Sequence, residues 1–208
     1  LGYSRSTRAI AEDENGNIYS TVVSDGVYKE DPSGNVTQLI EANKRGKSKM
    51  HDIMPYGLYY NNGQLWMCNW FDDGMLVYDI KSAEIEHLRT NSNLTGFGRC
   101  LLEDADGILW QGTDQGLNVV NTKKRTLSRF KSATHSDVLN TMNISSMIRA
   151  KGGKIWIGSK NHGVYFLDKN DQLSLFSNLK KGLSSNVILS IFEDDNYLWI
   201  GTNAGLNR

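Results

Sequence analysis

One motif recurs five times along this chain, and the repeat constrains the fold more than any other feature. Each copy holds an aromatic residue inside a short apolar run, a small residue two positions later, and a glycine after a short loop. The aromatic residues, called anchors below, recur 47, 44, 46 and 43 residues apart: Tyr19, Trp66, Trp110, Trp156 and Trp199. A period of about 45 residues indicates that one supersecondary unit is copied along the chain.

Each copy predicts four short antiparallel strands. In the third copy, residues 99–104 alternate and are followed by the turn Asp106-Gly107, and further strands are expected over 108–113, 116–121 and 126–130. Asp-Gly and Asn-Gly pairs adopt the positive φ angles that two-residue hairpins require. No window shows a sustained helical period. Four-stranded units at this spacing are typical of β-propeller blades.

The sequence therefore predicts an all-β fold, a partial β-propeller over residues 1–208. Because closed propellers commonly have more blades, we expect a fragment of a larger propeller with exposed strand edges. The anchors are expected to fill the space between blades rather than to form a site. Complete blades are expected over 7–40, 54–88, 98–130 and 144–176, and a partial blade over 186–208.

Composition excludes several classes of function. Among 208 residues, 23 Lys and Arg balance 23 Asp and Glu, so the formal net charge is zero. Such a chain lacks the charge field typical of binding to nucleic acid or an anionic membrane, and no apolar run approaches the ~18 residues of a spanning helix. Neither a cofactor nor a metal site is expected, and Cys68 and Cys100 are expected to be buried free thiols.

The last copy carries a specific resemblance. It reads NVILSIFED and then LWIGTNAGLNR over residues 186–208, and this pattern resembles the two-component regulator propeller repeat. Residues 99–121 match nearly as well, and residues 144–168 match with Arg149-Ala150 in place of Glu-Asp. The first two copies are more divergent.

The resemblance implies a function that the composition alone does not indicate. Such repeats form the periplasmic sensor region of Bacteroides-type hybrid two-component histidine kinases, many of which sense glycan-derived oligosaccharides. The resemblance implies that the chain is a periplasmic segment of an inner-membrane protein. Its partners would be an oligosaccharide, the remaining blades and ectodomain of the parent protein, and a second parent molecule in a homodimer. The chain has no kinase motif, so no catalytic activity is expected of it. We also expect it to be cut from a longer protein, since it begins at Leu1 without a signal-peptide pattern.

One loop departs from the repeat and is the first candidate for ligand binding. Where other copies have a short polar loop, the second copy has Asn69 followed by Trp70, Phe71, Asp72 and Asp73. Aromatic rings stack on the C–H faces of sugars and carboxylates bind hydroxyl groups, so this mixture suits a polar ligand. Packing against the segment 41–55 or a further blade, or a dimer contact, would also explain the aromatic pair.

Other candidates lie at equivalent positions of different copies. Arg8 and Arg99 each stand eleven residues before an anchor, near the start of an innermost strand, and could bind a carboxylate or sulfate. Pairing with a carboxylate of the blade is the structural alternative. Asp114, Lys160 and His162 occupy short loops on the face of Trp70. The basic loop 44–49 could attract an anionic ligand or be a solvated surface.

Two other classes of function remain open. A propeller lyase would need a convergent base, and His162 with Asp114 or Asp72 is the only set that could supply one. A protein-interaction scaffold would use the propeller face or the open edge. The recurring Glu-Asp pairs, which end at Asp13, Asp104 and Asp194, are expected to flank hairpins rather than to act as catalytic acids.

Overall fold

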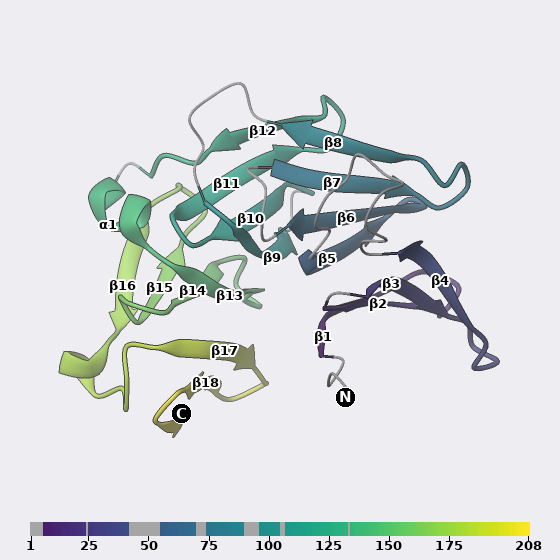
Figure 1. Ribbon diagram of the computed structural model, residues 1–208. Helices are drawn as coiled ribbons and strands as arrows, with labels where there is room; N and C mark the ends of the chain where they lie inside the picture. The colour runs from purple at the N-terminus through teal and green to yellow at the C-terminus, as the bar shows by residue number, and fades with distance from the viewer. Residues whose placement is uncertain are drawn as a thin grey trace. The chain divides into compact units, whose positions relative to one another are not determined.

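The structure is a computed structural model that describes residues 6–23, 25–41, 55–69, 74–89, 96–104, 107–132 and 134–208. Within these residues, five antiparallel sheets follow one another along the chain, four with four strands and one with three (Figure 1). Each sheet is one blade, so the prediction of four complete blades and one partial blade is confirmed. None of the described helices has the length and apolar character needed to span a membrane.

The chain divides into two compact units, Leu1–Arg89 and Thr90–Arg208. The first unit contains two blades, in which consecutive strands pair in the order of the sequence. Blade 1 contains β1 (Thr7–Glu12), β2 (Ile18–Val22), β3 (Gly26–Glu30) and β4 (Val36–Glu41), and blade 2 contains β5 (Pro55–Asn61), β6 (Gln64–Asn69), β7 (Gly74–Asp79) and β8 (Ile85–Arg89).

The second unit contains three blades and two short helices. The helices, α1 (Ser136–Thr141) and η1 (Leu179–Lys181), lie in the connections between blades. The strands are, in blade 3, β9 (Gly98–Glu103), β10 (Leu109–Thr113), β11 (Gly116–Asn121) and β12 (Thr126–Arg129); in blade 4, β13 (Ile144–Arg149), β14 (Ile155–Ser159), β15 (Val164–Leu167) and β16 (Leu173–Ser177); and in blade 5, β17 (Ile188–Glu193), β18 (Leu198–Thr202) and β19 (Gly205–Asn207).

Each blade has two different faces because side chains alternate along its strands. We call the face that carries the anchor the front and the opposite face the back. In the first unit, the front of blade 1 packs on the back of blade 2, where Tyr19 and Val27 join Leu58, Met67 and Leu76 in one core. The second unit repeats this contact between blades 3 and 4 and between blades 4 and 5. The anchors in these contacts are therefore core residues, as the sequence predicted.

Glycines on the front faces allow neighbouring blades to approach closely. A Cβ atom added to Gly112 would lie 2.6 Å from Cγ2 of Ile144 in the next blade, and one added to Gly158 would lie 2.6 Å from Cγ2 of Ile188. Both distances are far below van der Waals contact. The glycine two residues after the anchor is thus a slot that receives a β-branched side chain from the following blade.

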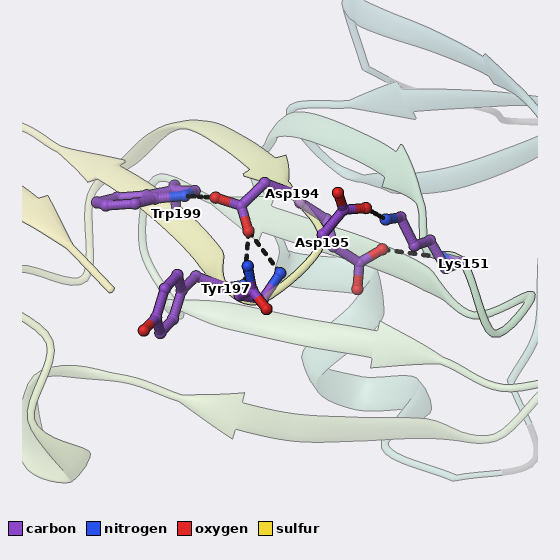
Figure 2. A network of polar contacts seen from close by, with 7 residues as sticks. Lys151, Asp194, Asp195, Tyr197 and Trp199 are labelled. Atoms are coloured by element: carbon purple, nitrogen blue, oxygen red, sulfur yellow. Dashed lines mark hydrogen bonds and ion pairs between the residues drawn. The ribbon is translucent and has the colours of Figure 1, made fainter.

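In blades 1, 3 and 5, a hydrogen bond links the anchor to its hairpin. The Asp13 carboxylate accepts the Tyr19 hydroxyl at 2.9 Å, and Asp104 accepts the Trp110 indole N–H at 2.7 Å. Figure 2 shows the same bond in blade 5, where Asp194 accepts the N–H of Trp199 at 2.6 Å. The hairpin-flanking role predicted for the recurring aspartates is confirmed.

Neither Cys68 nor Cys100 forms a disulfide within the described residues. Cys68 is buried in β6 as expected, whereas Cys100 in β9 is only partly buried as a residue, so the expectation of two buried thiols is wrong for Cys100. Burial raises the pKa of the Cys100 thiol to about 12. The thiolate form that reacts with oxidants or metals is therefore scarce at neutral pH at Cys100.

Candidate functional site

The aromatic loop of the second blade lies in the connection between β6 and β7. Its candidate residues Trp70, Phe71, Asp72 and Asp73 fall outside the described residues, as does the basic loop 44–49. Their assignment to a ligand site therefore stays a prediction from the sequence.

Arg8 and Arg99 occupy a special position of the blade. The register of each innermost strand shifts at one residue, which is characteristic of a β-bulge. All five blades have this irregularity at the same point, and the residues that occupy it are Arg8, Tyr56, Arg99, Ser145 and Leu189. The equivalence of the two arginines predicted from their spacing is confirmed, and the bulge gives their side chains a direction that regular pairing would not.

Within the first unit, two of these bulge residues meet. The guanidinium carbon of Arg8 lies 5.0 Å from the centre of the Tyr56 ring. A cation over an aromatic face is stabilised by the ring quadrupole, and the edge of the guanidinium keeps its N–H donors available. Arg8 is exposed, so it can present those donors to an anion. In the second unit, Ser145 instead donates its hydroxyl to the Ile188 carbonyl at 2.6 Å and links blades 4 and 5.

Asp114 holds its loop against the segment that precedes β9. Its carboxylate accepts the N–H of Phe97 at 2.8 Å, and its own N–H donates to the Phe97 carbonyl at 3.2 Å. In blade 5, Asn203 likewise donates its N–H to Val187 at 3.2 Å. In the second unit, loops between second and third strands therefore lie beside the connections between blades, on one face.

Lys160 and His162 lie in the equivalent loop of blade 4, beside α1. The Lys160 N–H donates to the Asn143 carbonyl at 2.8 Å, and Nε2 of His162 lies 3.4 Å from the hydroxyl oxygen of Thr141. His162 and Asp114 thus have separate partners, Thr141 and Phe97. Among the described residues, no three His, Cys, Asp or Glu side chains lie close enough together to hold a metal ion.

The structure also has a cavity of about 360 Å³ that the sequence did not reveal. It lies between blades 3 and 4, on the side of the hairpins that join first and second strands. Its lining has four charged residues, four apolar residues and one glycine: Asp104, Asp168, Lys169, Asp171, Ile108, Trp110, Ile155, Leu167 and Gly153. Two of its carboxylates already serve the fold, since Asp104 binds Trp110 and Asp168 accepts the N–H of Asn170 at 2.8 Å and of Gln172 at 3.0 Å. The sequence predicted the turns that line the cavity, but the cavity itself could not be predicted because it depends on how two blades pack.

Known structures share this fold across different functions. The extracellular domain of a protein from B. thetaiotaomicron, described as a hybrid two component system, has a TM-score of 0.76 at 20% identity, and the match covers 97% of this chain and 26% of that chain. PorZ of Porphyromonas gingivalis, a surface component of the type-IX secretion system, has a TM-score of 0.69 at 20% identity over 96% of this chain and 31% of PorZ. Virginiamycin B lyase from Staphylococcus aureus has a TM-score of 0.71 at 14% identity over 96% of this chain and 64% of the lyase.

At these identities the likeness shows the propeller fold and leaves the function open. The chain spans about a quarter of the hybrid two component structure. No curated protein sequence matches it. Residues 182–204 match the family described as two component regulator propeller. The chain therefore contains a two component regulator propeller repeat, in its fifth blade, as its sequence suggested.

Proposed function

We propose that this chain is a ligand-sensing segment of the extracytoplasmic region of a hybrid two-component sensor kinase, and that its ligand is a glycan-derived oligosaccharide. The observation that carries the proposal is the two component regulator propeller repeat at residues 182–204. The likeness to a sensor ectodomain over 97% of the chain supports it. The chain would be a partial propeller, and the kinase and the rest of the ectodomain would belong to the same parent.

The proposed site lies on the face that carries the loops between second and third strands. Trp70 and Phe71 would stack on sugar rings, and Asp72 and Asp73 would accept hydroxyl groups. Within the second unit, Asp114, Lys160 and His162 lie in the equivalent loops of blades 3 and 4 and would make polar contacts of their own. Arg8 and Arg99, at the bulges of innermost strands, would bind a carboxylate or sulfate group of an acidic sugar.

A signal requires more than binding. The ligand must have a higher affinity for one of two arrangements of the sensor, because a ligand that binds both equally shifts no equilibrium. In the proposed periplasmic ectodomain, those would be two arrangements of a homodimer of the parent. A hydroxyl-rich ligand held by loops from neighbouring blades of one unit would couple those blades to each other and would supply that difference.

A thermal-shift screen against neutral, uronic and sulfated oligosaccharides tests the proposal. A specific ligand at about a hundred times its dissociation constant stabilises the folded state by about 2.7 kcal/mol, which raises the melting temperature measurably. The double variant Trp70→Ala, Phe71→Ala should lose the shift. The matched control is Asn170→Ala in the exposed turn between the third and fourth strands of blade 4, at the opposite ends of the strands, which should keep it. A melting-temperature shift that persists in the double variant would mean that the ligand binds elsewhere. If no oligosaccharide in the panel raises the melting temperature, the glycan-sensor proposal is contradicted.

The likeness to PorZ favours a protein-interaction scaffold as the second candidate. Capture of a protein partner with no effect of any oligosaccharide on melting would support it. A lyase, the third class, would require turnover of a substrate that His162→Ala abolishes.

A further inference from the structure

The cavity between blades 3 and 4 lies entirely within the second unit, between two complete blades. Blade 3 contributes Asp104, Ile108 and Trp110 from its first hairpin, and blade 4 contributes the other six lining residues. The volume of about 360 Å³ lies at the lower end of the range typical of small-molecule pockets. The walls of the cavity therefore belong to this chain and leave room for a small molecule.

The equivalent end of the other two interblade contacts is closed by a side chain of the following blade. In the first unit, the Tyr60 ring of blade 2 stacks on the anchor Tyr19, with 5.8 Å between ring centres and 4° between ring planes. In blade 5, Glu193 occupies the position of Tyr60 and accepts the N–H of Lys151 at 2.9 Å. In blade 4 this position belongs to Arg149, which is exposed and is not among the residues that line the cavity. The cavity is thus open at the place where a side chain closes the other two contacts.

The lining combines apolar surface with an excess of negative charge. Ile155, Leu167 and the anchor Trp110 are buried residues that supply apolar surface. The charged residues of the lining are three aspartates and one lysine, so three carboxylates and one ammonium give a formal net charge of −2. The side chains of Lys169 and Asp171 are exposed, and neither has a hydrogen-bond or ion-pair partner among the described residues. The Asp171 carboxylate is therefore available to a ligand, beside a cavity whose charge favours a cation.

We propose that this cavity binds a small organic cation that carries an apolar ring, such as an arylalkyl amine. The ring would lie against Ile155 and Leu167, at the end of the interblade contact that Tyr60 fills in the first unit. The ammonium would donate a charge-assisted hydrogen bond to Asp171, whose carboxylate the fold does not use. Because the cavity lies at the hairpin ends of the strands, away from the loops proposed to bind an oligosaccharide, this site does not depend on that proposal.

Three probes of nearly the same shape and different charge test the proposal: benzylamine, benzyl alcohol and benzoate. Benzylamine is a cation at neutral pH and should bind the full chain with a dissociation constant of about 1 mM. The uncharged alcohol and the anionic benzoate should bind about fivefold more weakly or worse, since they cannot pair with the carboxylate. In a titration followed by ¹H–¹⁵N NMR, benzylamine should move the indole signal of Trp110, which lines the cavity, and leave that of Trp199 in blade 5 unchanged. Equal affinity for the alcohol and the amine, or no binding of the amine at about 20 mM, would overturn the proposal.

Two substitutions separate the charge of the site from its shape. Asp171→Asn removes one carboxylate and should weaken benzylamine binding about fivefold; the turn should persist because asparagine tolerates the left-handed φ of 59° at this position. Asp195→Asn removes the same charge from an exposed hairpin of blade 5 and should bind benzylamine like wild type. Ile108→Phe fills part of the cavity without a change of charge and should weaken binding about tenfold; Ile108 is 39% exposed, so the fold should tolerate the larger ring.

The melting temperature of each variant without a probe verifies that it is folded. Unchanged affinity for benzylamine in either Asp171→Asn or Ile108→Phe would mean that the amine binds elsewhere on the surface, and the proposal would be wrong.

Discussion

Blades 3 and 4 have the same strand order and the same type of hairpin, yet the anchor tryptophans of the two blades differ in their hydrogen bonds. In blade 3, Asp104 accepts the indole N–H of Trp110 at 2.7 Å and the backbone N–H of Ile108 at 2.9 Å. In blade 4, Ala150 stands at the position of Asp104, and the buried Nε1 of Trp156 has no hydrogen-bond partner among the described residues.

The rings show what replaces the missing bond. Among the described residues, Trp110 has one edge-to-face partner, Phe130, at 5.0 Å between ring centres, whereas Trp156 has two, Phe176 at 4.9 Å and Phe166 at 5.6 Å. Aromatic packing contributes area and quadrupole attraction, but it does not satisfy a buried donor. Both blades therefore keep a tryptophan that fills the space between blades, but only blade 3 keeps the hydrogen bond from the indole N–H to the hairpin.

The largest effect is expected when blade 3 is given the residue of blade 4. Asp104→Ala removes both acceptors and leaves the N–H of Trp110 buried and unpaired. We expect a loss of about 2 kcal/mol in the free energy of unfolding, because an unsatisfied buried donor carries a full desolvation cost. Urea unfolding measures the loss, and hydrogen exchange in 98–113 should accelerate.

Asp104→Asn is the matched control for this experiment. It keeps an oxygen acceptor of nearly the same size, so it should retain part of the stability. Equal losses in the alanine and asparagine variants would mean that the carboxylate charge, and not acceptance of the two N–H groups, supports the hairpin.

The reverse exchange should stabilise blade 4. Ala150 has the same backbone bonds to its hairpin as Asp104, so a carboxylate in Ala150→Asp could reach the indole of Trp156. We expect a gain of about 1 kcal/mol, smaller than the loss in blade 3 because the new side chain must enter a packed site. A double-mutant cycle with Trp156→Phe isolates the new bond. A gain that persists without the indole N–H would come from another source.

Much of this fold could be predicted because one repeat carries it. The spacing of the anchors predicted the blades and the core role of the tryptophans, and the recurring aspartates were expected at the hairpins. Helix α1 was not predicted, because its six residues show no helical period and follow His135, whose φ of 54° lies in the left-handed region. Connections between blades have no repeat to support a prediction.

The candidate site was harder to predict because its contacts join segments far apart in sequence. The spacing placed Arg8 and Arg99 at equivalent positions, but it could not show the bulge or the ring of Tyr56 beneath Arg8. Asp114 was selected as a polar loop residue, and its bond to Phe97 depends on a segment 17 residues earlier. Sequence patterns predict which residues are equivalent, whereas neighbours in space require the packed structure.

Lowering the pH should reveal how much Asp194 of blade 5 contributes to the free energy of unfolding. The bond from Trp199 and the backbone N–H groups of Asn196 and Tyr197 lower the pKa of Asp194 below its ordinary value of 3.8. A carboxyl with a depressed pKa in the folded state adds stability above its unfolded pKa, and that stability is lost as the pH falls through the folded pKa. Asp194→Asn should therefore flatten the fall in stability below about pH 4. An unchanged acid limb in that variant would contradict the lowered pKa.

The smallest effect is expected next to that aspartate, where two neighbouring carboxylates have different partners. Figure 2 shows Asp194 directed at the indole of Trp199 and Asp195 paired with Lys151 of blade 4. The side chains of Lys151 and Asp195 are 61% and 86% exposed. Water and salt screen such a pair, so Asp195→Asn should change the free energy of unfolding by about 0.5 kcal/mol or less, and by nothing measurable in about 1 M salt. Urea unfolding at low and high salt provides the measurement, and a salt-independent loss above about 1 kcal/mol would show that the pair, despite its exposure, helps to hold blade 5 on blade 4.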